Sequence, residues 1–133
     1  GGRMTDDELE DYLVNWGRWS RESRGPGRSP MARLIAEAGA MSGIFESDSP
    51  VDIAKAVQVN RAWQGMPCTT HSDRCIKALI AALYAYPVSR EHMLSLIWRH
   101  FKLRMRYRDV DNFLTRGRTV IRNRLEKILH RPL

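Results

Sequence analysis

Apolar residues recur at helical spacing along nearly the whole chain, and this pattern constrains the fold more than any other feature. It is clearest in the last third of the sequence. On a helical wheel, six residues fall within roughly 40° of Ile121. They are Tyr107, Val110, Leu114, Gly117, Leu125 and Ile128. The pattern predicts a long helix from about Tyr107 to Leu129 that buries one stripe.

Capping signals and the same period predict five helices before it. The first is expected at about 6–19, with a capping box at Thr5 and Glu8, and the second at 30–41. The third follows Ser49-Pro50, the fourth runs from Ser72 to Pro87, and the fifth spans about 89–101 with Ser89 as its cap. The third helix is expected to bury Ile53, Ala54 and Val57, with Trp63 as a further candidate. Trp16 and Trp19 are expected to be packing anchors, although Trp19 could instead contact a protein partner.

These elements predict one compact all-α domain, since no run of alternating apolar residues indicates a strand. Residues 1–4 hold the start, where Gly1–Arg3 resemble a cloning remnant. Residues 5–88 form an N-terminal helical part with a flexible basic loop at 20–29, and residues 89–133 form a basic C-terminal part. No apolar run is long enough for a membrane span. The two cysteines are expected to be free thiols in a reducing cytoplasm.

The positive charge of the chain is concentrated in its C-terminal part. The formal net charge is +7, and residues 89–133 alone hold 12 basic against 4 acidic side chains. Ten of those 12 are arginine, which binds phosphate and guanine through two parallel hydrogen bonds. The bias favours a nucleic-acid partner. A solvated basic surface, or one that meets an acidic protein, remains the alternative.

Two helices at about 89–101 and 107–129, joined by the basic stretch 102–106, match the outline of a helix-turn-helix. In that motif the start of the second helix meets base edges in the major groove. The residues expected to contact DNA are Arg90, Arg104, Arg106, Arg108, Asn112, Thr115, Arg116, Thr119 and Arg122. Among them, Arg90, Arg104 and Thr115 are expected near phosphates. An exposed polar face that binds nothing is the alternative.

Motifs for other chemistry are weak. Cys68, His71 and Cys75 have an unusual spacing for a zinc site, with Asp73 as the one nearby candidate for a fourth ligand. We therefore expect no metal, and Cys75 is expected in the core. The sequence has no glycine-rich phosphate loop, paired-acid site or nucleophile motif. It thus predicts neither an enzyme, nor a cofactor, nor a small-molecule substrate.

Short motifs spread over the chain are similar to those of one phage family. They are Tyr12-x3-Trp16-Gly17-x-Trp19, the basic loop after it, a helix ending in Leu79–Tyr86, Ser89-Arg90-Glu91, and Val120-Ile121 with Leu125. On these motifs the chain resembles the phage late-gene antitermination protein Q, in the form found in lambdoid phages other than phage lambda. The family commonly has an Ile-Ala pair in the first helix of the motif and a glycine in its turn. Here the positions read Met93-Leu94 and His100-Phe101-Lys102-Leu103.

The resemblance implies a function in transcription. Q-like proteins bind DNA beside a late promoter, engage bacterial RNA polymerase paused with its sigma factor, and make it read through pauses and terminators. Their C-terminal module is similar to the promoter-binding region of sigma factors (region 4), which would place DNA contacts on Arg90 and on residues 104–122. The implied location is the cytoplasm of a bacterial host. A helix-turn-helix repressor that leaves polymerase unmodified, or a basic protein-interaction module, remains open.

Overall fold

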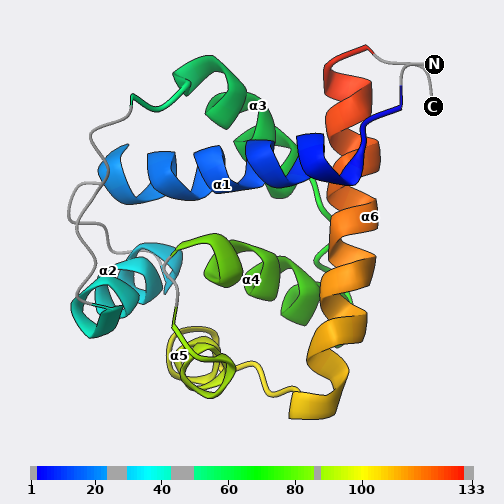
Figure 1. The fold of residues 1–133 in the computed structure, drawn as a ribbon. Coiled ribbons are helices and arrows are strands. Elements are labelled where there is room, and N and C mark those ends of the chain that lie inside the picture. The colour runs from blue at the N-terminus through cyan, green and yellow to red at the C-terminus, as the bar shows by residue number, and fades with distance from the viewer. Residues whose placement is uncertain (1–2, 24–29, 43–49, 86–87, 131–133) are drawn as a thin grey trace.

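The structure is a computed structural model that describes residues 3–23, 30–42, 50–85 and 88–130. Within these residues the chain is all-α, as the sequence predicts (Figure 1). The elements are α1 (Asp6–Ser23), α2 (Pro30–Ser42), α3 (Ile53–Gln64), α4 (His71–Ala85), α5 (Arg90–Phe101), the short 3-10 helix η1 (Tyr107–Asp109) and α6 (Val110–Ile128). None of the described helices combines the length and the apolar character needed to cross a membrane.

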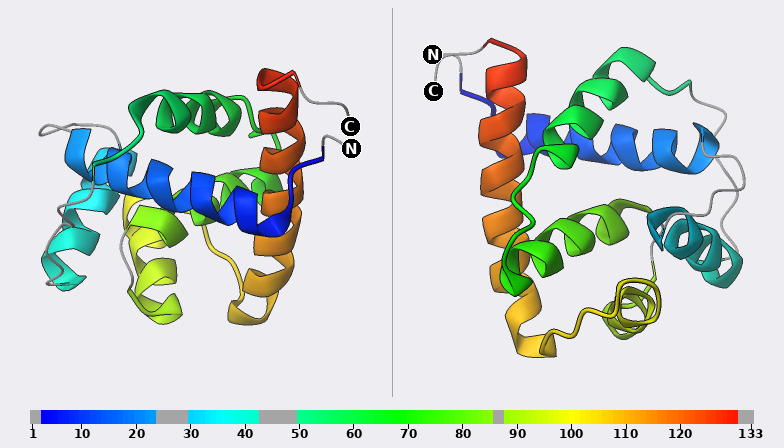
Figure 2. Two further views of the ribbon diagram at one scale, coloured as in Figure 1. Left: turned by 45° about the horizontal axis from the view of Figure 1, so that its top comes forward. Right: turned by 180° about the vertical axis from the view of Figure 1, so that it is seen from behind.

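Helix α6 runs along one side of the molecule and crosses the ends of α1, α3 and α4 (Figures 1 and 2). It packs mainly against α3 and α4, while α1 packs against α3 and α4, and α5 packs against α2 and α4. One buried cluster contains residues from all six α-helices, including Leu13, Leu34, Val59, Leu79, Ile97 and Ile121. The basic C-terminal part therefore shares its core with the N-terminal part.

The stripe predicted for the last helix is confirmed from Val110 onward. Leu114, Ile121 and Leu125 are buried, and Ile121 and Leu125 are fully so. Tyr107 was wrongly placed in that stripe, because the residue is 52% exposed. The reason is that residues 107–109 form the 3-10 turn η1, whose tighter winding takes Tyr107 out of line with the α-helical face.

Two of the predicted helix caps are confirmed, and some helix boundaries are shifted. The amide of Glu8 donates to Thr5 Oγ1 at 3.1 Å, and the amide of His92 donates to Ser89 Oγ at 3.2 Å. Helix α4 begins one residue before Ser72, with Thr70 Oγ1 accepting from the amide of Asp73. Helix α1 continues to Ser23, so the predicted loop is helical over 20–23. The rest of that loop, Ser49 and Pro87 lie outside the described residues.

The predicted apolar face of α3 was wrong. Ile53, Ala54 and Val57 are exposed, and the helix instead buries Ala56, Val59 and Ala62. Two polar contacts with α1 set this rotation. Asn15 exchanges two hydrogen bonds with the backbone of Asp52 (2.8 and 3.0 Å), and the indole of Trp16 donates to Asn60 at 3.3 Å. The small residues at the contact allow close packing of the helices.

Two glycines allow α1 and α6 to approach α4 closely. A Cβ on Gly17 would collide with the carbonyl group of Tyr84, and a Cβ on Gly117 would lie 2.6 Å from Ile80 Cγ1. Trp16, one residue before Gly17, is buried in the core, and Trp19 is half-buried against it. The Trp-Gly-x-Trp motif thus combines anchors with a site of close helix packing.

Candidate nucleic-acid interface

The segment between α5 and η1 directs its basic side chains outward. Residues 102–106 alternate, with Lys102, Arg104 and Arg106 exposed and Leu103 and Met105 packed against the core. Successive side chains of this segment therefore point to opposite sides, as they do along an extended chain. This linker, residues 102–106, was predicted only as a basic stretch. It is longer than the turn of three or four residues usual in a helix-turn-helix.

Lys102 ends α5 in the left-handed conformation, with φ 58°, and its amide donates to the carbonyl of Trp98. Glycine adopts this conformation most easily at the end of a helix. The turn therefore forms without the glycine that the resembled family commonly has there. It also reverses the chain so that the linker can run back past the side chain of Trp98.

Trp98 supports the arginine at the centre of the linker. The residue is 40% exposed, and Arg104 Cζ and Lys102 Nζ lie 4.1 Å and 5.5 Å from the centroid of its ring. The backbone of Arg104 is also held, because His71 Nε2 donates to its carbonyl oxygen at 2.8 Å. A cation on an aromatic face gains roughly 0.5–1 kcal/mol at an exposed site. Arg104 is thus restrained at both its backbone and its guanidinium.

Three residues predicted to contact DNA are spaced four positions apart along η1 and the start of α6. Arg108, Asn112 and Arg116 are all exposed. The Arg116 guanidinium carbon lies 5.9 Å from the Phe113 ring centroid. None of the ion pairs within the described ranges involves Arg108 or Arg116. Their guanidinium groups are therefore ready to bind an anion without first leaving a carboxylate.

The two predicted threonines are also exposed on α6. The hydroxyl of Thr115 donates to the carbonyl of Asp111 at 3.0 Å, and that of Thr119 donates to the carbonyl of Thr115 at 3.1 Å. Such bonds to the preceding helical turn use the hydroxyl proton. Each hydroxyl oxygen can still accept a hydrogen bond. The hydroxyl group would have to rotate away from the helix carbonyl before it could donate to a phosphate.

Two of the arginines predicted to contact DNA form ion pairs with nearby carboxylates. Arg90 Nη1 lies 2.6 Å from Asp111 Oδ1, and Arg106 Nε lies 3.2 Å from Asp109 Oδ2. The side chains of Arg106 and Asp111 are 69% and 76% exposed, so both ion pairs are solvated and weak, about 0–1 kcal/mol. A phosphate could replace either carboxylate at small cost.

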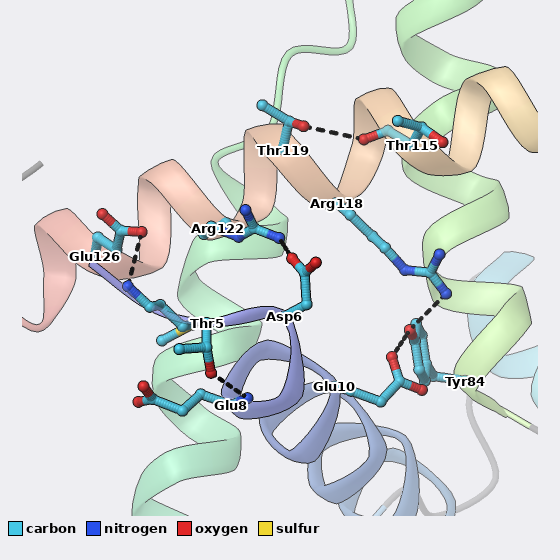
Figure 3. Close-up of polar contacts among 11 residues, drawn as sticks. Thr5, Asp6, Glu8, Glu10, Tyr84, Thr115, Arg118, Thr119, Arg122 and Glu126 are labelled. Atoms are coloured by element: carbon cyan, nitrogen blue, oxygen red, sulfur yellow. Dashed lines mark hydrogen bonds and ion pairs between the residues drawn. The ribbon is translucent and has the colours of Figure 1, made fainter.

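Arg122 lines a pocket with Thr115 and Thr119, but its guanidinium is already paired with a carboxylate of α1. Figure 3 shows it directed toward α1, where it forms an ion pair with Asp6. One turn earlier, Arg118 Nη2 donates to Tyr84 Oη at 3.2 Å, and Tyr84 donates to Glu10 at 2.7 Å. Burial, followed by the bond to Glu10, raises the pKa of Tyr84 to about 12. These arginines tie α6 to the acidic start of α1.

We define the basic surface as Lys102, Arg104, Arg106, Arg108, Asn112 and Arg116. The segments that carry it, the linker and the start of α6, lie toward the opposite end of α6 from the start of α1 (Figure 1). Sequence reasoning found all of these residues except Lys102, but it missed Trp98. The available signal was that Trp98 falls outside the apolar stripe of its own helix, beside a run of cations.

The cysteines and His71 form no metal centre in the described part of the chain. Cys75 is buried, as predicted, and burial raises the pKa of its thiol. Its Sγ lies 3.5 Å from His71 Nε2, whereas Cys68 is exposed.

Compared with models of protein families, with curated proteins and with solved structures, the chain matches none of them. The basic surface must therefore be interpreted from its own geometry and chemistry.

Proposed function

We propose that the protein is a phage transcription antitermination factor that binds double-stranded DNA through the basic surface. The observation that supports DNA binding most strongly is the exposure of Arg104, Arg108 and Arg116 on the linker and the helical segment that follows it. None of the three has a carboxylate partner among the residues that the structure describes. The resemblance of the sequence motifs to Q proteins supports antitermination as the biological role. Bacterial RNA polymerase and its sigma factor are then the protein partners, in the cytoplasm of the host.

In this proposal the start of α6 enters the major groove and the linker follows the DNA backbone. Arg108 and Arg116 would bind guanine or phosphate, and Asn112 would bind adenine through paired hydrogen bonds. Arg104, held on Trp98, would bind a phosphate with little further loss of side-chain freedom. Arg90 and Arg106 would exchange weak surface ion pairs for phosphates.

The proposed role needs binding energy and no covalent chemistry. DNA contacts would hold the protein beside a promoter, which raises its local concentration near a paused polymerase. Protein contacts would then keep it on the polymerase after the DNA is released.

An in-vitro transcription assay tests this proposal. The template carries the phage late promoter upstream of a terminator, with bacterial RNA polymerase and sigma factor present. The wild-type protein should increase readthrough, and Arg108→Ala and Arg116→Ala should lose site-specific DNA binding and readthrough together. Arg33→Ala removes an exposed arginine of α2 that is not one of the residues of the basic surface, and it should behave as wild type.

Other outcomes would refute the proposal. Site-specific DNA binding without readthrough would indicate a helix-turn-helix repressor instead. No preference for any DNA fragment at moderate salt would indicate a basic protein-interaction module.

A further inference from the structure

A groove of about 350 Å³ opens between α2, α3, α4 and the end of α5, on elements other than the start of α6. Its floor is apolar and its edge carries cations. The lining residues are Met31, Trp63, Cys68, Arg74, Lys77, Ala78, Phe101 and Leu103. Leu103 belongs to the linker. The next residue, Arg104, is exposed and is part of the basic surface.

The floor of this groove suits an apolar side chain. The indole nitrogen of Trp63 donates to the carbonyl of Lys77 at 2.9 Å, so the ring offers carbon surface with its polar atom already satisfied. Phe101 and Leu103 add further half-buried apolar surface. Met31 and Trp63 also border a second, small void of about 10 Å³.

The edge of the groove is positive. Lys77 Nζ donates to the carbonyl of Gln64 at 2.9 Å and lies 5.0 Å from the centroid of Trp63. Arg74 Nε donates to the carbonyl of Cys68 at 3.2 Å. Neither cation takes part in an ion pair within the described ranges, and no carboxylate lines the groove. Their charges therefore favour an occupant with acidic groups beside its apolar part.

We propose that this groove binds an amphipathic helical segment of a partner protein, with leucine or phenylalanine anchors on the floor and Asp or Glu beside Arg74 and Lys77. An apolar helix face in a groove is a common mode of peptide recognition. The inference does not depend on the proposed function, since it uses different residues and would hold if the protein bound no DNA.

Cys68 at the edge of the groove provides the readout. It is exposed, whereas Cys75 is buried, so alkylation of intact protein by N-ethylmaleimide should modify Cys68 first. The probes are two designed helical peptides with the same leucine and phenylalanine face. One carries glutamates on its polar face and the other carries lysines. Mass spectrometry gives the rate of Cys68 modification in the presence of each peptide.

The glutamate peptide should slow modification of Cys68 at least tenfold, with a Kd in the range of about 1–100 μM. The lysine peptide should not slow it. Arg74→Glu combined with Lys77→Glu should reverse this preference. Lys55→Glu combined with Arg61→Glu, an equal charge change at exposed residues of α3, should leave it unchanged. Circular dichroism establishes that each variant is folded.

Three outcomes would overturn the proposal. One is equal protection by both peptides, or protection by neither up to about 1 mM. A second is protection without peptide that rises with protein concentration, since a second copy of this chain would then occupy the groove. The third is protection by a single-stranded oligonucleotide as strong as that by the glutamate peptide.

Discussion

The guanidinium carbon of Arg104 lies 4.1 Å from the centre of the Trp98 ring, so an arginine of the linker stacks on an exposed tryptophan of α5. The two residues are six positions apart, and the left-handed turn at Lys102 brings them together. The pair gives the linker a defined geometry at the point where we expect it to meet a phosphate.

Trp98→Leu is expected to weaken binding to duplex DNA about three- to tenfold, because Arg104 regains rotamer freedom and loses its cation–π contact. Trp98→Phe keeps an aromatic face and should retain most of the affinity. Fluorescence anisotropy with a labelled duplex measures both variants. In an Arg104→Ala background, Trp98→Leu should have little further effect. Fully additive losses would contradict the coupling of the two residues.

Gly117→Ala is expected to destabilise the protein by about 1–3 kcal/mol. In an open helix interior the same change would stabilise by roughly 0.5–1 kcal/mol. Here the new Cβ would lie 2.6 Å from Ile80 Cγ1 and 2.8 Å from its Cδ1. Urea unfolding gives the change in free energy, with exposed Lys127→Ala as the control. Ile80→Ala should lower the free energy of unfolding less in the Gly117→Ala background than in the wild type. Equal losses in the two backgrounds would refute the steric explanation.

Tyr84 should make stability fall at high pH. Its pKa is about 12 in the folded protein and about 10 in the unfolded chain, so ionisation favours unfolding between these values. The stability that neutral Tyr84 contributes to the folded state is complete below about pH 10 and is lost as the pH approaches about 12. Unfolding free energies at pH 9 to 12 should therefore fall by about 2–3 kcal/mol more in wild type than in Tyr84→Phe. Parallel pH curves would contradict this role.

Arg122 is expected to act in stability more than in DNA binding. A double-mutant cycle of Arg122→Ala with Asp6→Ala should give a coupling of about 0.5–1 kcal/mol, since the Asp6 side chain is 86% exposed. Arg122→Ala should also reduce DNA affinity less than Arg116→Ala does. An equal loss of affinity would mean that Arg122 leaves Asp6 and belongs to the DNA-binding set.

The sequence was most informative where one helix face alone decides burial. Ile121 and its neighbours define α6 because a helix of that length must bury a continuous apolar stripe. Thr5 and Ser89 mark helix starts because their hydroxyls bond to amides within the same turn. Such local signals do not depend on where the other helices lie.

The rotation of α3 could not be predicted in the same way. Ile53 and Val57 are larger and more apolar than Ala56 and Ala62, yet hydrogen bonds from α1 and close packing turn the small residues inward. Contacts between residues distant in sequence decide this. The pairing of Arg122 with Asp6 is of the same kind, because 116 positions separate the two residues.

The candidate site was predicted by residue type and refined by geometry. Charge and spacing were sufficient to select Arg104, Arg108 and Arg116. The support from Trp98, however, depends on the extended linker and on a left-handed lysine, where the sequence offers no glycine to mark the turn.

The central claim, that the basic surface binds duplex DNA, is tested most directly by the salt dependence of DNA affinity. Anisotropy titrations from low to moderate salt compare wild type with Arg108→Ala, Arg116→Ala and the control Arg33→Ala. Wild-type affinity should fall steeply with salt, with a slope of log affinity against log salt concentration of about −3 or steeper. Arg108→Ala and Arg116→Ala should each weaken binding, and each should reduce the magnitude of this slope by about one where the arginine meets a phosphate. Arg33→Ala should match wild type. Equal effects of all three variants, or wild-type binding that does not change with salt, would contradict the account.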